Sequence, residues 1–227
     1  MTRTVMITGA AGNLGRAVAA AFAATGDRLV LVARTRDALE RAYGTEDARR
    51  LFGAADLLDA QALRQALQPI GPIDVLCNLA GGFTMGTPVH ATPEADWRRM
   101  QDLNVGTLVH AVGAVVPGML ERGAGRIVNV GANAALRGAA EMGAYIAAKS
   151  EVLRLTEAMS AELRGHGINV NCVMPSIIDT PENRAAMPGA DPSRWVAPAD
   201  LAQVIVFLAS DGARAVHGAC IPVVGQS

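Results

Sequence analysis

Residues 4–15 read Thr-Val-Met-Ile-Thr-Gly-Ala-Ala-Gly-Asn-Leu-Gly, and this stretch indicates the fold. Thr4–Thr8 is a short apolar run without polar alternation, which is typical of a strand buried on both faces. Gly9 permits a tight turn, Gly12 the close approach of a pyrophosphate, and Gly15 the packing of the following helix on the strand. Because the N-terminus of that helix faces the phosphates, the strand, turn and helix together predict dinucleotide binding.

Short apolar runs alternate with helical patterns along the rest of the chain. Strands are expected at Thr4–Thr8, Arg28–Ala33, Arg50–Ala54, Ile73–Leu79, Arg126–Gly131, Ile168–Met174 and Gly218–Val223. Helices are expected at Leu14–Ala24, Asp37–Tyr43, Ala60–Leu67, Glu94–Pro117, Gly143–Gly165 and Ala199–Ser210. The alternation predicts an α/β, single-domain Rossmann fold over residues 1–227, with a doubly wound, seven-stranded parallel sheet and helices on both faces.

A ligand of such a sheet should bind beyond the carboxyl ends of the strands, at the topological switch point. The proline-rich segment Asp179–Pro198 lies between the sixth strand and the last helix. A long irregular segment in this position is either a substrate lid or a plain surface connection.

The composition excludes several classes of protein. Among 227 residues, 51% are hydrophobic and 18% charged, with a net charge of −1. This balance excludes a disordered chain and leaves no basic surface for nucleic acid or an anionic membrane. The uncharged stretch Leu103–Leu120 contains Asn, Thr, His, Gly and Pro, so a buried helix is expected rather than a membrane span.

Cysteine and histidine usage points to a cytoplasmic protein without a metal site. The three cysteines are an odd set in apolar, strand-like contexts, where we expect reduced thiols that serve packing. We expect no signal peptide, because a strand-like run starts almost at Met1, and no metal site, because the four histidines are scattered.

Tyr145 and Lys149 are the strongest chemical signal in the chain. A spacing of four residues places both on one face of a helix. Of twenty basic residues, nineteen are Arg and only Lys149 is Lys, which suggests that this position needs an ammonium group. A cation beside a phenol should lower the phenol pKa from about 10 toward neutrality, as suits a general acid–base. The alternative is an ordinary exposed helix face.

The end of the second predicted strand bears on the choice of cofactor. Ala33 stands where a carboxylate would bind the ribose of NAD, and Arg34 follows it. Since Arg can grip a 2′-phosphate, the pair predicts NADP, with NAD possible; the alternative for Arg34 is a solvated charge. Asp56 could accept a hydrogen bond from the adenine amino group or cap the helix that begins near Leu58.

Over its whole length the chain resembles a short-chain dehydrogenase/reductase of the classical length. The matching motifs, in order, are Gly9/Gly12/Gly15, Asn78-Leu79-Ala80-Gly81, Asn104, Tyr145/Lys149 and Pro175-Ser176…Thr180. The resemblance implies that Tyr145 protonates the substrate as the nicotinamide delivers hydride. It also implies that Lys149 binds the nicotinamide ribose and that Asn104 holds a proton-relay water. The positions implied for cofactor binding are Gly9, Gly12, Asn13, Leu14, Gly15, Arg34, Asp56, Leu57, Asn78, Ala80, Gly81, Tyr145, Lys149, Pro175, Ile178 and Thr180.

Three positions depart from the family's pattern. Leu79 replaces the second Asn of Asn-Asn-Ala-Gly, Asn13 stands where many members have a glycine, and Ala132 occupies the place of the catalytic serine. An alanine at that last position is similar to the dihydropteridine reductase-like branch, as is the lid from Asp179 to Trp195. Against that branch, Arg34 replaces its acidic NAD-binding residue.

Together these features predict an NADPH-dependent reductase that acts on a C=O or C=N group of a pterin-like, carbonyl or quinonoid small molecule. One rival is a dinucleotide-binding paralogue with little turnover, which Ala132 favours. Another is a 3-oxoacyl or ketone reductase. The family resemblance also implies a homodimer or homotetramer, assembled through the two long helices.

Overall fold

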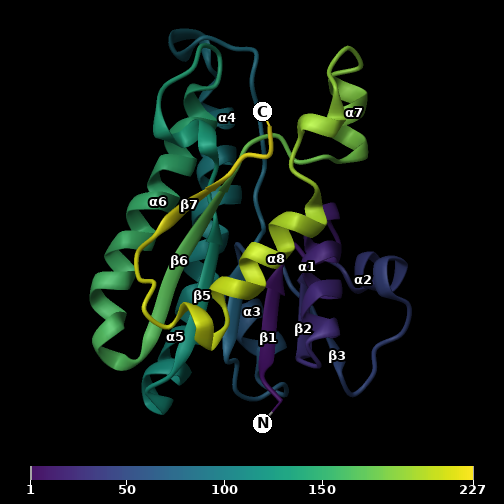
Figure 1. Cartoon of the computed structure of the whole chain (residues 1–227), viewed down its shortest axis with the longest axis vertical. Helices are drawn as coiled ribbons and strands as arrows, with labels where there is room; N and C mark the ends of the chain where they lie inside the picture. Colours follow the sequence, from purple (N-terminus) through teal and green to yellow (C-terminus); the bar gives the residue numbers. More distant parts are fainter. Residues whose placement is uncertain (1, 227) are drawn as a thin grey trace.

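The computed structural model describes residues 2–226, which form one seven-stranded parallel sheet (Figure 1). The strand order is β3-β2-β1-β4-β5-β6-β7, so the chain reverses its direction of winding between β1 and β4. The strands are β1 Thr4–Thr8, β2 Arg28–Ala33, β3 Arg50–Ala54, β4 Val75–Asn78, β5 Gly125–Val130, β6 Ile168–Pro175 and β7 Cys220–Val223. The seven-stranded, doubly wound Rossmann fold expected from the sequence is confirmed.

Helices cover both faces of this sheet. One face carries α1 Asn13–Ala24, α2 Arg36–Tyr43 and α8 Pro198–Leu208. The other carries α3 Ala60–Leu67, α4 Glu94–Gln101, α5 Thr107–Arg122 and α6 Gly143–Leu163. The short helix α7, Pro181–Ala186, stands apart, beyond the carboxyl ends of the strands (Figure 1).

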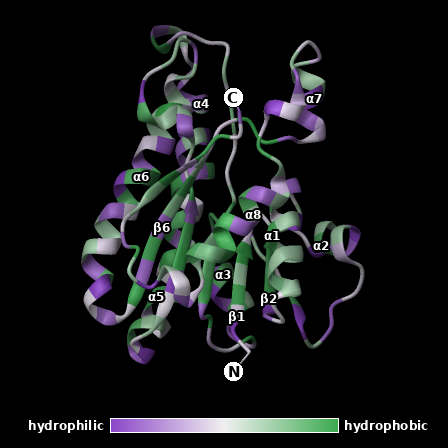
Figure 2. Cartoon of the chain, in the orientation of Figure 1, coloured by the Kyte–Doolittle hydropathy of each residue, from purple (hydrophilic) through white to green (hydrophobic). Residues whose placement is uncertain are grey.

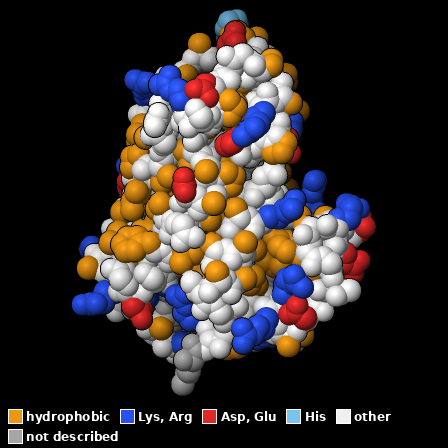
Figure 3. Space-filling view, turned by 45° about the vertical axis from the view of Figure 1, so that its right-hand side comes forward, with side chains coloured by type: hydrophobic (Ala, Val, Ile, Leu, Met, Phe, Trp, Pro, Cys, Tyr) orange, Lys and Arg blue, Asp and Glu red, His pale blue; other side chains and the backbone are white. Residues whose placement is uncertain are grey.

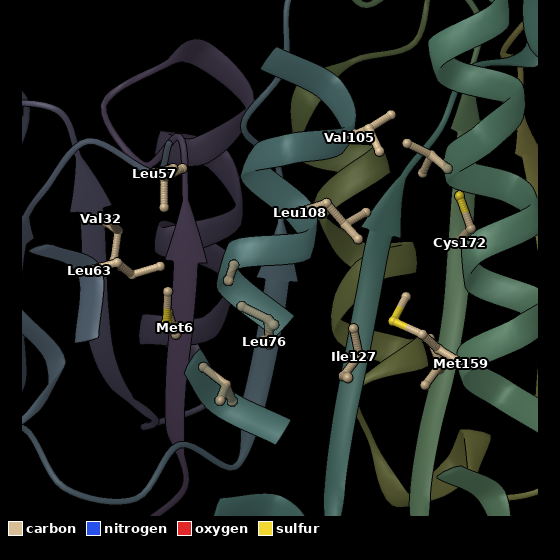
Figure 4. Packing of buried hydrophobic residues seen from close by; sticks show 14 of the residues in the cluster. Met6, Val32, Leu57, Leu63, Leu76, Val105, Leu108, Ile127, Met159 and Cys172 are labelled. Carbon is tan, nitrogen blue, oxygen red and sulfur yellow. The ribbon is translucent and has the colours of Figure 1, made fainter. Parts of the chain in front are cut away.

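Alternate residues of each strand fill two separate cores. Val5 and Ile7 pack under α1 and α8, whereas Met6, between them, packs under α3 and α5. Figure 4 shows the second core, where Leu63 of α3 and Leu108 of α5 lie over the strands. Both faces are buried, so the strands are mostly hydrophobic, whereas many polar residues lie on the outer helices and on α7 (Figure 2). The exceptions in β4, β5 and β6 are the buried asparagines Asn78, Asn129, Asn169 and Asn171.

The long helix expected at Glu94–Pro117 is longer than predicted and interrupted. A π-helical segment, Asp102–Gly106, separates α4 from α5, and α5 continues through Pro117 to Arg122. Proline normally ends a helix because it lacks an N–H donor. Here Met119, fully buried beyond it, holds the next turn against the sheet, and the helix ends at the left-handed Gly123, with φ of 64°.

By length and composition alone, the stretch Glu94–Arg122 could cross a membrane. Its apolar face instead lies in the core, where Met100, Ala111 and Met119 are fully buried. On the face of the molecule shown in Figure 3, positive and negative side chains are interspersed rather than gathered into one basic patch.

The segment Asp179–Pro198 is partly ordered by secondary structure. It contains α7 and a 3₁₀ turn at Pro192–Arg194. Its two ends are joined by a parallel bridge between Ile178 and Val196, in which the Asp179 N–H donates to the Val196 carbonyl at 2.8 Å. The segment therefore forms a loop whose two ends are hydrogen-bonded to each other beyond the strand ends, a geometry that suits a lid.

Candidate active site

The glycine-rich turn has the geometry that each glycine was expected to permit. Gly9 has a φ of 64°, and a Cβ there would lie 3.0 Å from the backbone of Ala80. A Cβ on Gly15 would lie 2.4 Å from the Gly9 carbonyl oxygen, so α1 packs directly on the turn. Gly12 is exposed, as expected for a residue that a pyrophosphate approaches.

The ends of β1 and β4 are fastened to each other by one hydroxyl group. Thr8 Oγ1 accepts hydrogen bonds from the N–H groups of Leu79, at 3.0 Å, and Ala80, at 3.1 Å. This contact holds the Ala80-Gly81 backbone beside the glycine turn, at the point where the winding of the sheet reverses. The topological switch point is the expected place for a bound dinucleotide.

Gly81, Asn104 and Lys149 meet at one point beyond β4 and β5. A Cβ on Gly81 would lie 2.7 Å from Asn104 Oδ1 and 3.3 Å from Lys149 Nζ. Lys149 Nζ donates to the Val130 carbonyl at 2.8 Å, at the last residue of β5. Tyr145 lies one helical turn before Lys149 on α6, and its ring meets that of Phe83 edge-on, with centroids 4.8 Å apart.

The side-chain amide of Asn104 is hydrogen-bonded to the protein backbone through both its oxygen and its nitrogen. Its Oδ1 accepts from the Gly82 N–H at 3.1 Å, and its Nδ2 donates to the carbonyls of Gly82 and Met100 at 3.1 and 3.0 Å. Asn104 lies in the π-helical segment and is buried. It therefore ties the backbone beside Gly81 to the long helix.

Burial dominates the electrostatics of the tyrosine and the lysine. It lowers the pKa of Lys149 from 10.5 to about 8, because a low-dielectric surrounding disfavours the charged ammonium. Burial likewise raises the pKa of Tyr145 from 10.0 to about 12. The expected lowering of the Tyr145 pKa by Lys149 is therefore wrong for this structure. The ammonium donates to the Val130 carbonyl, and the phenol gains no compensating charge.

The two arginines that follow β2 have different surroundings. Arg36 is ion-paired to Glu40 at 2.9 Å and to Glu46 at 2.7 Å, and its guanidinium lies over the Phe52 ring. Arg34 is exposed and makes no hydrogen bond or ion pair with any other of residues 2–226. Arg34 is thus the arginine that remains available to an anionic ligand.

The residues near the expected adenine and nicotinamide contacts are placed as follows. Asp56 Oδ1 accepts from the Leu58 N–H at 2.9 Å. The helix cap is instead Asp59, which bonds two N–H groups at the start of α3, so the capping alternative for Asp56 is wrong. The Leu57 carbonyl lies 2.8 Å from Nδ1 of His110, which fixes the backbone beside Asp56.

Asn78 does not present its side chain to the site. It is buried, its Nδ2 donates to Asn129 Oδ1 at 2.9 Å, and Asn129 in turn donates to Thr156. Asn78 Oδ1 is buried without a hydrogen-bond partner. If Asn78 contacts a cofactor, it does so through its backbone.

The segment after β6 reaches back to the glycine turn. Pro175 ends β6, and Thr180 caps α7 by accepting from the Asn183 N–H at 3.2 Å. Asn13 Nδ2 then donates to Glu182 Oε2 at 2.7 Å, which joins α7 to the turn. Sequence reasoning missed Glu182 and Phe83, because neither belongs to a motif and only the fold brings them to the site.

Ala132 is buried and begins a 3₁₀ turn over Asn133–Leu136. Its methyl group can donate no hydrogen bond. The hydroxyl of Ser176, directly after the end of β6, donates to the Val224 carbonyl at 2.9 Å.

Comparison with known proteins agrees with this geometry. The family model described as short chain dehydrogenase matches residues 3–190. The chain belongs to the short-chain dehydrogenase/reductase family. It is 32% identical to 2-(R)-hydroxypropyl-CoM dehydrogenase of Xanthobacter autotrophicus, covering 99% of this chain and 98% of that protein. It is also 34% identical to the inactive 2-(S)-hydroxypropyl-CoM dehydrogenase 2 of the same organism, covering 92% of this chain and 98% of that protein.

Solved structures of the family have the same fold. A short-chain oxidoreductase of Burkholderia thailandensis has a TM-score of 0.90 at 34% identity, covering 99% of this chain and 92% of its own. A gluconate 5-dehydrogenase of Burkholderia cenocepacia in complex with NADP and tartrate has a TM-score of 0.90 at 27% identity, covering 98% and 94%. An NAD⁺-bound xylitol dehydrogenase has a TM-score of 0.88 at 26% identity, covering 98% of each chain. The family therefore uses a nicotinamide dinucleotide, with either form represented.

Proposed function

We propose that this protein is an NADPH-dependent reductase of a small molecule, in which Tyr145 is the proton donor. The observation that carries the proposal is the meeting of Gly81, Asn104 and Lys149 beside Tyr145, beyond the carboxyl ends of β4 and β5. A protein that only binds a dinucleotide has no use for a buried lysine with a lowered pKa next to a phenol.

The glycine cradle and the unpaired Arg34 fit a dinucleotide, and the bound cofactor would supply the hydride. Gly9 and Gly15 let the turn and α1 pack closely, and the exposed Gly12 would let a pyrophosphate approach the N-terminus of α1. Arg34 would grip the 2′-phosphate of NADPH, whereas Ala33 offers no acceptor to the ribose of NADH. This difference supports NADP over NAD.

Tyr145 gives its proton to the substrate atom that becomes electron-rich. Its pKa of about 12 keeps the phenol protonated at neutral pH, which is the form a proton donor needs. Lys149, with a pKa of about 8, is mostly protonated at neutral pH and can lose a proton at little cost, so it can resupply the phenol. The side-chain amide of Asn104 is already hydrogen-bonded to Gly82 and Met100, so a proton-relay water would bind the main-chain carbonyl of Asn104.

The walls of the site favour a flat or apolar substrate. Phe83, Met85, Val89 and Leu136 are large hydrophobic side chains that are each more than half exposed. Phe83 touches the Tyr145 ring, and Val89 packs at Gly143, at the start of α6. Phe83 thus gives the reacting phenol an apolar neighbour, which supports an apolar or flat substrate.

Ala132 bears on which chemical class of substrate the site can reduce. Without a serine hydroxyl, Tyr145 alone must stabilise the charge that develops on a ketone oxygen. A quinonoid pterin or another electron-poor C=N system needs less help, because its charge spreads over several heteroatoms. The dihydropteridine reductase-like branch is therefore our preferred comparison, ahead of a 3-oxoacyl or ketone reductase. The second candidate function is dinucleotide binding with little turnover, and the similarity to an inactive 2-(S)-hydroxypropyl-CoM dehydrogenase supports it.

We further propose a cytoplasmic homodimer or homotetramer. The long helices α5 and α6 would pair between copies, and the exposed Val109 of α5 offers an apolar contact.

The deciding experiment measures NADPH oxidation against a panel of ketones, quinones and quinonoid pterins. We expect turnover of an electron-poor compound, and Tyr145→Phe should reduce kcat by about 100-fold or more while NADPH still binds. Tight NADPH binding with no turnover of any compound would contradict the proposal and support the inactive paralogue. A Tyr145→Phe variant that keeps most of its kcat would show that the proton comes from elsewhere.

A further inference from the structure

Two of the three cysteines lie opposite each other on neighbouring strands. Cys172 of β6 and Cys220 of β7 are partners in the parallel register, and both are free thiols. Both side chains face α6, because Cys220 packs against the core cluster that contains Cys172 and Met159. Figure 4 shows Cys172 in this cluster, on the strand beneath the helix.

The two thiols differ in accessibility and acidity. Cys172 is fully buried, its Sγ donates to the Val173 carbonyl at 3.4 Å, and the neighbouring Cys220 thiol together with burial raises its pKa. Cys220 is half-buried at the edge of the sheet, and hydrogen bonding with Cys172 lowers its pKa. Arg154 and Glu157 of α6 face Cys220 and are ion-paired at 2.8 Å, so their opposite effects on the thiol largely cancel. Cys220 is therefore the thiol that reacts first with a solvent-borne oxidant.

We propose that Cys172 and Cys220 form a reversible disulfide when the protein meets a peroxide. The Cys220 thiolate attacks hydrogen peroxide, the O–O bond breaks, and Cys220 becomes a sulfenic acid as hydroxide leaves. The Cys172 sulfur then attacks the Cys220 sulfur, losing its proton, and water leaves as the S–S bond forms. Two thiols and one peroxide thus yield one disulfide and two waters.

The strand geometry makes this bond both reachable and easy to reduce. Neighbouring strands lie about 4.7–4.9 Å apart, within the range of about 4.4–6.8 Å between the Cα atoms of a disulfide. Side chains opposite each other stand parallel, so closing the bond strains the pair, and a strained disulfide is readily reduced. β7 is a four-residue edge strand, so it can shift to accommodate the bond.

The disulfide would lie next to the proposed catalytic centre. Cys172 Sγ is 3.0 Å from where a Cβ of Gly131 would be, directly after the carbonyl of Val130 that holds Lys149. The Cys172 sulfur is also close enough to Lys149 for each to affect the pKa of the other. The thiol pair itself does not depend on the proposed reduction, and its test needs no activity assay.

The test treats the whole protein with hydrogen peroxide, blocks the remaining thiols with iodoacetamide, and maps the peptides by mass spectrometry without reduction. We expect free thiols to fall from three to one, with the Cys172 and Cys220 peptides cross-linked, and dithiothreitol to restore all three. Cys77 is the internal control, since it is fully buried and burial raises its pKa, so it should stay reduced.

The variant Cys220→Ser, at the sheet edge, should remove the cross-link and leave Cys172 as a thiol. Three results would overturn the proposal. These are three unreacted thiols, Cys220 as a sulfinic acid without a cross-link, and a disulfide between two copies, seen as a dimer on a non-reducing gel.

Discussion

Replacing Lys149 by methionine should stabilise the protein while abolishing its reduction chemistry. Burial lowers the pKa of Lys149 from 10.5 to about 8. Each pKa unit corresponds to about 1.4 kcal/mol, so charging this lysine in the fold costs about 3 kcal/mol at neutral pH. Methionine has a similar length and no charge, so the variant escapes this cost. It also loses the bond to the Val130 carbonyl, which offsets about 1–2 kcal/mol. We therefore expect a net gain of about 1–2 kcal/mol.

The sign of the pH dependence distinguishes this account from a simple packing effect. Below pH 8 the lysine is charged in both the folded and unfolded states, and the cost of burial is fully present. Between pH 8 and 10.5 the folded state binds fewer protons than the unfolded state, so the stability of the wild type rises with pH. The advantage of Lys149→Met should therefore be full at pH 7 and vanish as the pH rises between 8 and 10.5. At pH 10.5 the variant should be less stable than the wild type by about 1 kcal/mol, because the loss of the bond to the Val130 carbonyl remains.

Urea denaturation of the wild type and the variant at pH 7 and 10.5, without cofactor, measures the effect. Arg154→Met is the matched control, because it removes a cation from the same helix at a side chain that is 69% exposed. That control should change the stability by less than about 0.5 kcal/mol. A Lys149→Met variant that is less stable at pH 7, or equally shifted at both pH values, would refute the reasoning.

Three further predictions concern the cofactor and the substrate. Arg34→Ala should weaken NADPH binding by about 10- to 100-fold and leave NADH unchanged in fluorescence titrations. Arg36→Ala, whose arginine is already ion-paired, is the control, and equal weakening of both cofactors would reject the assignment. Ala132→Ser should raise kcat/KM on simple ketones by at least about tenfold and barely change kcat/KM for a quinonoid pterin; a wild type that already reduces ketones efficiently and gains nothing from the serine would show that another donor replaces it. Glu182→Gln should tighten NADPH binding by about two- to fivefold, because the Glu182 carboxylate bonded to Asn13 repels the pyrophosphate; weaker binding would show that the charge is needed.

Much of the fold and the nucleotide half of the site followed from local sequence. Strands β1, β2 and β3 and helix α3 have the bounds that were expected, because short apolar runs and their capping residues act over a few neighbours. The glycine spacing predicted the turn for the same reason, since the positive φ of Gly9 and the contact of Gly15 with the turn are local requirements. The spacing of Tyr145 and Lys149 also placed both on one helix.

The tertiary structure decided what depends on residues distant in the chain. Pro117 does not end its helix, because the burial of Met119 against the sheet outweighs the local cost of proline. Arg34 and Arg36 have the same charge; the pair of Arg36 with Glu40 follows from their spacing in α2, but its second pair, with Glu46, depends on how the connection to β3 folds. The pKa of Tyr145 rises rather than falls, because the surrounding elements bury the phenol, while the lysine ammonium donates to the Val130 carbonyl. Pairwise spacing within a helix fixes which residues are neighbours, whereas burial and charge depend on every element that packs around them.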